Sequence, residues 1–135
     1  MTDIMTAIAE RRSAKRFDPS VIIPEHELRA ILDAGRKAPT AFNIQHWRFV
    51  VVSDPELRKQ IRAVSWDQPQ VEEAGALIIL CADFKAWDKN PARYWAAAPE
   101  NMQTTYEGMI RQFYDGNEQF QRDEGIRSCG MAAYA

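Results

Sequence analysis

Trp47-Arg48-Phe49-Val50-Val51-Val52 is the stretch that decides the fold, because aromatic and β-branched residues of this kind favour a β-strand. Farther along the chain, Leu77-Ile78-Ile79-Leu80-Cys81 is apolar throughout, which is typical of a strand buried on both faces. Between the two, Asp54-Pro55-Glu56 has the composition of a helix start, and apolar residues then repeat on one helical face. Two strands separated by a helix predict a sheet covered by helices.

The flanking sequence predicts further helices. The pattern of apolar residues and caps indicates helices over Asp3–Arg11, Pro24–Lys37 and about 100–120, with a short helix or turn at Gln68–Ala74. The small residues of 130–135 resemble the start of another buried helix, so we expect the chain to be truncated inside an element at its C-terminus.

Length and composition set broad limits on the protein. The chain has 135 residues, which is enough for one domain over 1–135, and 46% of them are hydrophobic, which excludes a disordered chain. Its longest apolar run, 74–82, is about half of a membrane span. With no secretion pattern at the N-terminus, we expect a cytoplasmic protein with no membrane contact.

The segment Arg11-Arg12-Ser13-Ala14-Lys15-Arg16 concentrates positive charge in a chain of net charge −2. Guanidinium groups and a lysine fit the oxygens of a phosphate dianion, and a local cluster favours a small ligand over a long polyanion. The plainer alternative is a solvated helix end whose cations suit the helix dipole. A nucleic-acid contact is a third interpretation, but no further basic stripe accompanies the cluster.

The segment Ala38-Pro39-Thr40-Ala41-Phe42-Asn43-Ile44-Gln45-His46-Trp47 lies between a predicted helix end and a strand start. Its proline fixes a turn, and its hydroxyl and amide side chains offer hydrogen bonds. Such a loop is either structural or a hydrogen-bonding shelf for a flat ligand. The aromatic-rich segment 83–125 likewise either packs on the core or roofs a pocket.

Taken in order, these segments resemble the nitroreductase family of FMN-dependent oxidoreductases. The family's Arg-Arg-Ser-x-Arg-x-Phe signature is matched by 11–17, with Lys15 at its fifth position. Its Ala-Pro-Ser-x-x-Asn-x-Gln-Pro-Trp signature is matched by 38–47, with Thr and His in place of Ser and Pro, and Gln68-Pro69-Gln70-Val71 is a third match. The resemblance implies an α+β fold, with a central, mostly antiparallel sheet flanked by helices and incomplete at its C-terminal end.

The resemblance also implies a cofactor site. The positions that hold the FMN phosphate and ribityl group and reach the pyrimidine edge of the ring correspond to Arg11, Arg12, Ser13 and Lys15. The loop that reaches the flavin from the neighbouring subunit of a homodimer corresponds to Pro39, Thr40, Ala41 and Asn43. The region that hydrogen-bonds the ring and ribityl chain corresponds to Gln68 and Gln70. No metal site and no dedicated catalytic side chain are expected.

The implied activity is a flavin-dependent oxidoreduction. NAD(P)H would reduce FMN by hydride transfer, and a small electrophile such as a nitroaromatic, quinone or enone would then take the electrons. Because the family continues beyond the point where this chain stops, the alternative is a flavin-binding domain or remnant without turnover.

The remaining reactive side chains have structural interpretations. His46 is expected to be a structural histidine without a visible proton-relay partner, and His26 a solvated surface residue. Cys81, in the apolar strand, is expected to be an inert buried thiol, with Cys129 the more accessible of the two cysteines.

Overall fold

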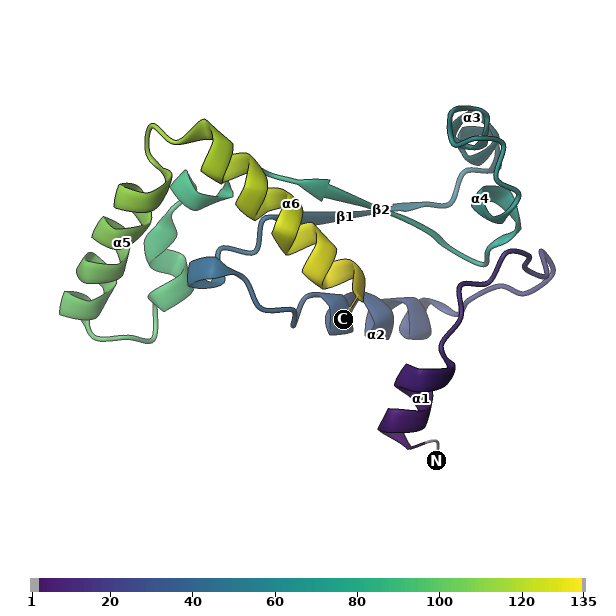
Figure 1. Ribbon diagram of the computed structural model, residues 1–135, viewed down its shortest axis with the longest axis horizontal. Coiled ribbons are helices and arrows are strands. Elements are labelled where there is room, and N and C mark those ends of the chain that lie inside the picture. The colour runs from purple at the N-terminus through teal and green to yellow at the C-terminus, as the bar shows by residue number, and fades with distance from the viewer. Residues whose placement is uncertain (1–2, 135) are drawn as a thin grey trace. The chain divides into compact units, whose positions relative to one another are not determined.

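The computed structural model describes residues 3–134 (Figure 1). The chain divides into two compact units. The first comprises the chain up to Ile23 together with Val52–Leu77, and the second comprises Pro24–Val51 and the chain from Ile78 onward. The single domain expected from the chain length stays a prediction.

The first unit is helical. Its helices are α1 (Ile4–Glu10), α3 (Pro55–Val64) and α4 (Gln70–Glu73). The side chain of Asp3 caps α1 by accepting a hydrogen bond from the N–H of Thr6 at 3.4 Å, and that of Asp54 caps α3 by accepting from the N–H of Glu56 at 2.8 Å. Both caps satisfy amide groups that have no partner inside the helix.

Arg58 ties α3 to the rest of the first unit. Its guanidinium donates to the backbone carbonyls of Val52 at 3.0 Å, Glu72 at 3.3 Å and Ala74 at 2.7 Å. Because the aliphatic part of an arginine also packs, this one side chain fixes the helix against the segment that follows α4.

The second unit holds nearly all of the sheet. Its elements are α2 (Glu25–Gly35), the short 3₁₀ turn η1 (Ala41–Asn43), β1 (Trp47–Val52), β2 (Leu77–Ala82), the turns η2 (Ala86–Asp88) and η3 (Pro91–Trp95), α5 (Glu100–Tyr114) and α6 (Glu118–Tyr134). β1 and β2 are neighbours, and the N–H of Asp83 donates to the carbonyl of His46 at 2.8 Å. The residue before β1 thus pairs with the residue after β2, so the strands are antiparallel, and the α+β class is confirmed.

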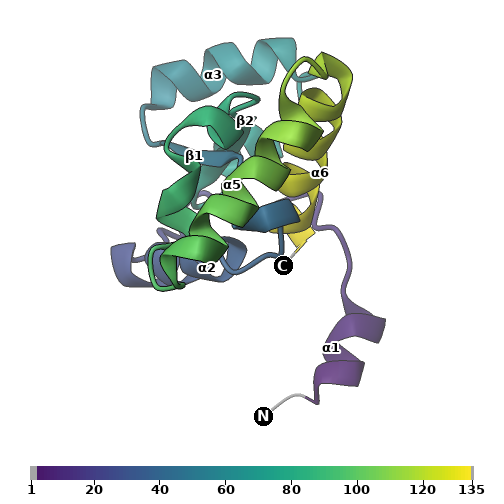
Figure 2. The same cartoon turned by 90° about the vertical axis from the view of Figure 1, so that its left-hand side faces the viewer.

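α6 runs across the strand pair, and α5 packs beside it (Figures 1 and 2). The close approach depends on Gly125, because a Cβ there would lie 2.6 Å from Phe84 Cδ1 and 3.4 Å from the Cβ of Ala82. Two buried clusters form the core: Ile44, Ala86, Trp87, Ile110 and Tyr114, and separately Ala38, Trp47 and Ala132.

The C-terminal helices differ from the sequence-based expectation. The helix expected over 100–120 ends at Tyr114, and a break follows in which Gly116 takes a φ of +69°. A glycine adopts this left-handed conformation without steric cost, which explains the break. A new helix starts at Glu118, so the small residues at 130–134 form the end of α6 and not the beginning of a helix, and residue 135 lies outside the described residues.

The expected burial of β2 on both faces was wrong. Leu80 packs with the cluster around Ala132, and Ala82 faces Gly125, so both point toward α6. Since side chains alternate along a strand, Cys81 points to the opposite face, where it is exposed. Cys129 on α6 is half-buried, so the predicted order of accessibility of the two thiols is reversed. Burial raises the pKa of the Cys129 thiol, and the nearby charge of Cys81 raises it further.

Among residues 3–134, no helix combines the length and the apolar content that crossing a membrane requires.

Candidate functional site

The loop before β1 is held in one shape by its own contacts. Thr40 Oγ1 accepts the N–H of Gln45 at 3.2 Å, and the Thr40 carbonyl accepts the N–H of Asn43 at 3.0 Å. Ile44 is fully buried beneath the loop. Phe42, Asn43 and Gln45 have φ values of 52°, 56° and 55°, a region that costs L-residues conformational energy. The surrounding contacts therefore hold a strained, preorganised loop.

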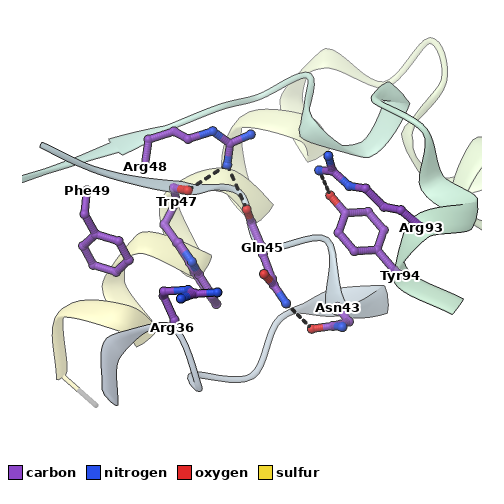
Figure 3. A pocket seen from close by; sticks show the side chains of 8 residues that line it. All are labelled: Arg36, Asn43, Gln45, Trp47, Arg48, Phe49, Arg93 and Tyr94. Atoms are coloured by element: carbon purple, nitrogen blue, oxygen red, sulfur yellow. Dashed lines mark hydrogen bonds between the residues drawn. The ribbon is translucent and has the colours of Figure 1, made fainter. Parts of the chain in front are cut away.

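This loop borders a cavity of about 630 Å³ in the second unit (Figure 3). The side chains around it are of three kinds. The guanidinium groups come from Arg36, Arg48 and Arg93, the amides from Asn43 and Gln45, and the aromatic rings from Trp47, Phe49 and Tyr94. The two amides are joined, since Gln45 Nε2 donates to Asn43 Oδ1 at 2.9 Å.

Arg48 joins the loop to the end of β2. One guanidinium nitrogen donates to the carbonyls of Trp47 at 2.8 Å and Gln45 at 3.2 Å, and the other donates to Asp83 Oδ2 at 2.8 Å. Burial by itself would raise the pKa of Asp83, but hydrogen bonds from Lys89 and from the Lys85 amide, together with the nearby positive charges, lower it below its ordinary value. Asp83 is therefore ionised near neutral pH and keeps Arg48 in place.

A second cavity, of about 280 Å³, lies where residues 39–41 meet α6. The residues that line it are Pro39, Thr40, Ala41, Glu124, Arg127, Ser128 and Met131. Glu124 is buried and forms an ion pair with the exposed Arg127. Of the four predicted loop residues, Pro39, Thr40 and Ala41 therefore border the smaller cavity, and Asn43 borders the larger one.

His46 is a buried structural residue, as expected, but it has a partner that the sequence does not reveal. Its Nδ1 lies 3.1 Å from Ser128 Oγ on α6, and both residues are almost completely buried. The pKa of His46 is lowered to about 4, mainly by burial. The negative charge of Asp83 opposes this shift, and the positive charge of Arg48 adds to it. The imidazole is therefore neutral near pH 7 and fixes the loop to α6. His26, by contrast, is on the surface, as predicted.

The basic segment 11–16 lies in the first unit, directly after α1, and its side chains are exposed. Arg12 bonds back to the carbonyls of Ala9 at 3.0 Å and of Arg11 at 2.9 Å. Arg11 and Lys15 form no salt bridge with any residue that the structure describes. These two cations keep their full capacity to bind an anion.

The end of the basic segment is tied to α4, which contains the third predicted motif. Arg16 forms a salt bridge to Glu73 at 3.1 Å, and the N–H of Phe17 donates to the same carboxylate at 3.3 Å. At the other end of this helix, Gln70 Nε2 donates to Gln68 Oε1 at 3.2 Å. Within the first unit, Arg16 and Phe17 thus hold the end of the basic segment against α4, the helix that begins at Gln70. Gln68 borders a cavity of about 290 Å³.

The predicted site residues fall into two groups. The first unit holds Arg11, Arg12, Ser13, Lys15, Gln68 and Gln70. The second unit holds Pro39, Thr40, Ala41 and Asn43. No sequence motif indicates Arg93 at the larger cavity, whereas Tyr94 belongs to the aromatic-rich segment 83–125, for which roofing a pocket is one of the two alternatives.

Comparison with known proteins identifies the family. The family model described as the nitroreductase family matches residues 8–135, a range that contains all three motifs. This chain belongs to the nitroreductase family. The expected nitroreductase-like fold is confirmed as well, since a structure from Exiguobacterium sibiricum solved in complex with FMN superposes with a TM-score of 0.85 and 26% identity, over 99% of this chain and 67% of that one.

Two proteins of other organisms are similar to this chain in sequence. Protein DrgA of Synechocystis is 48% identical over 130 residues, which is 96% of this chain and 62% of that protein. A Thermus thermophilus protein named NADH dehydrogenase is 44% identical over 85 residues, covering 62% of this chain and 40% of that protein. The match therefore covers less than two thirds of DrgA, and the shorter match to the Thermus protein covers less than half of that protein.

Proposed function

We propose that this chain carries the cofactor-binding part of an FMN-dependent oxidoreductase that takes its electrons from NAD(P)H. The observation that carries the proposal is the basic segment. In a member of the nitroreductase family, Arg11 and Lys15 stand exposed and unpaired among the described residues, and Arg16 and Phe17 tie the segment's end to α4. The FMN complex of a related structure and the name of the Thermus relative support the two cofactors.

The residues present fit a phosphorylated cofactor. Phosphate oxygens accept hydrogen bonds from guanidinium and ammonium groups, and Arg11, Arg12 and Lys15 supply both kinds of donor. Ser13 adds a hydroxyl to the same segment. A cation near a ring carbonyl also stabilises the negative charge that the carbonyl gains on reduction, and Lys15 would have this role.

The other motifs complete the proposed site. Gln68 and Gln70 would hydrogen-bond the ring and ribityl chain from the first unit. In a cytoplasmic homodimer, Pro39, Thr40, Ala41 and Asn43 would contact the flavin of the neighbouring subunit. The strained backbone of this loop supports such a role, because preorganised loops are common at ligand sites.

When bound, FMN would accept a hydride from NAD(P)H and pass the electrons to a small electrophile such as a nitroaromatic, quinone or enone. The chain's own residues bind and orient; no described side chain needs to act as an acid or a base. The reaction would depend on positioning and on stabilisation of charge.

Visible spectroscopy tests the proposal. The purified chain is incubated with FMN, freed of unbound flavin and reduced with NADH or NADPH without oxygen. We expect a retained flavin spectrum that bleaches on adding the nicotinamide. Flavin that is retained but does not bleach would favour the non-catalytic alternative, and a chain that retains no flavin would contradict both.

A further inference from the structure

One buried side chain of α6, Ser128, borders the loop 38–46 near both of its ends. Its Oγ lies 3.1 Å from His46 Nδ1, where the loop leads into β1. Ser128 also borders the cavity of about 280 Å³ together with residues 39–41, where the loop begins. A single residue of α6 therefore lies between the beginning and the end of the loop.

The hydrogen bond between Ser128 and His46 is closed to solvent. Ser128 is 2% exposed, and His46 is fully buried, with its ring stacked on Tyr114 at 5.9 Å between ring centres. Among residues 3–134, His46 Nε2 has no hydrogen-bond partner, so the bond to Ser128 is the one that orients the ring. Because a buried polar group that loses its partner cannot bond to water instead, the serine hydroxyl holds the imidazole firmly.

His46 belongs to a strained stretch of backbone. Its carbonyl accepts the N–H of Asp83 at 2.8 Å, which fixes it to the residue that follows β2. Before it, Asn43 and Gln45 have φ values of 56° and 55°, and the N–H of Gln45 donates to Thr40 Oγ1 at 3.2 Å. A positive φ costs an L-residue conformational energy, so the loop keeps its shape only while contacts such as those of His46 hold it.

We infer that Ser128 is a positioning residue for FMN: by orienting His46, it keeps the loop 38–46 in the shape that binds the cofactor. This role rests on the proposed function, in which residues 39–43 contact the flavin of the neighbouring subunit. If the loop of the unliganded protein spends less time in the binding shape, the apparent affinity for FMN falls in proportion. The alternative is a purely structural pair, whose loss would lower stability and leave the affinity unchanged.

Two replacements of equal size test the inference, because Ser128→Thr keeps the hydroxyl and Ser128→Val removes it. The affinity for FMN, measured by quenching of flavin fluorescence, should fall about tenfold in Ser128→Val. Ser128→Thr should bind FMN as the unmodified chain does. Thermal melts show whether each variant is folded, and Ser128→Ala, which adds no volume, replaces a valine variant that does not fold. Equal affinities of the folded variants with and without the hydroxyl would overturn the inference.

Gln121→Ala separates positioning from a general weakening of α6. Gln121 is another buried polar residue of this helix; its Nε2 donates to the Tyr114 carbonyl at 2.6 Å, and its Oε1 accepts from Lys85 Nζ at 2.8 Å. Because neither partner belongs to the loop, the substitution should lower the melting temperature and leave the FMN affinity unchanged. A loss of affinity as large as that of Ser128→Val would show that any weakening of α6 releases FMN, which contradicts a specific role of Ser128.

Amide hydrogen exchange gives a readout that does not depend on the cofactor. In the flavin-free chain, the amide hydrogens of Asn43 and Gln45, which bond to Thr40, should exchange faster in Ser128→Val than in Ser128→Thr. Equal exchange in the two variants would remove Ser128 from this role while leaving the proposed function intact. An unmodified chain that takes up no FMN, by contrast, would contradict the proposed function and the role of Ser128 together.

Discussion

The loop 38–46 of the second unit and the basic segment 11–16 of the first carry the two strongest sequence motifs, yet they differ in how their polar groups are used. In the loop, Thr40, Gln45 and Asn43 bond to one another, and Ile44 and His46 are buried. In the basic segment, the side chains are exposed, and Arg11 and Lys15 have no salt-bridge partner among the described residues.

The loop owes its shape to contacts within the second unit, whereas the basic segment keeps exposed cations, for which we propose a role in binding a ligand. Substitutions in the loop should therefore lower the free energy of unfolding, whereas substitutions in the basic segment should lower affinity and leave stability alone. The contrast can be tested at Ile44, at His46 and in the basic segment, and Gly125 tests the packing of α6, whose Ser128 contacts His46.

Ile44→Ala should lower the free energy of unfolding by about 2–5 kcal/mol, because it opens a cavity at a position with 0% exposure. Urea denaturation measures the change. The matched control is Ile4→Ala on α1, where the isoleucine is 71% exposed and the change should stay within about 0.5 kcal/mol. Equal changes in the free energy of unfolding for the two substitutions would show that the loop is not held by its buried side chain.

Stability should fall on acidification because of His46, whose folded-state pKa is about 4 against an ordinary value of 6.5. As the pH falls through 6.5 the unfolded chain takes up a proton that the folded protein resists, so stability present above that pH is lost toward pH 4. The full loss is about 3 kcal/mol, because each unit of difference in pKa between the two states corresponds to about 1.4 kcal/mol. Titration of the imidazole by nuclear magnetic resonance measures the pKa directly, with His26 as the internal exposed control; a His46 pKa near 6.5 would be incompatible with its burial.

Gly125→Ala should destabilise the fold by about 1–3 kcal/mol, because the new Cβ would lie 2.6 Å from Phe84 Cδ1 and force α6 away from the strand pair. Gly130→Ala is the control on the same helix, since its Cβ would meet nothing within 4 Å, and it should be neutral or stabilising. Thermal melts compare the two. A neutral Gly125→Ala would show that α6 does not pack so closely.

Arg11→Ala and Lys15→Ala should each weaken FMN binding about tenfold while the free energy of unfolding changes by less than about 0.5 kcal/mol. Fluorescence quenching of FMN measures the affinity, and urea denaturation measures the stability. Arg29→Ala serves as a charge-matched control away from the motif. Loss of stability without loss of affinity would show that the basic segment is structural after all.

Much of the local structure could be predicted from the sequence, because its signals are local. Asp3 and Asp54 cap the helices that their positions indicate, and Trp47–Val52 is a strand with the expected bounds. The two motifs also mark a member of the nitroreductase family, since their order and spacing are preserved.

The rest depends on contacts between residues far apart in the sequence. Ser128 partners His46 from 82 residues away, and no local pattern indicates it. The apolar composition of β2 indicates burial but cannot say which face α6 covers, so the exposure of Cys81 was missed. Arg93 borders the larger cavity only because η3 is folded beside the loop.

Native mass spectrometry of the chain with FMN tests the central claim most directly, because it weighs the subunits and the cofactor in one experiment. We predict a species that carries one FMN for each chain, with much less FMN retained when Arg11 and Lys15 are both replaced by alanine. Equal retention by the folded double variant, or a flavin-free mass for the unmodified chain under the same conditions, would contradict the proposed role of the basic segment.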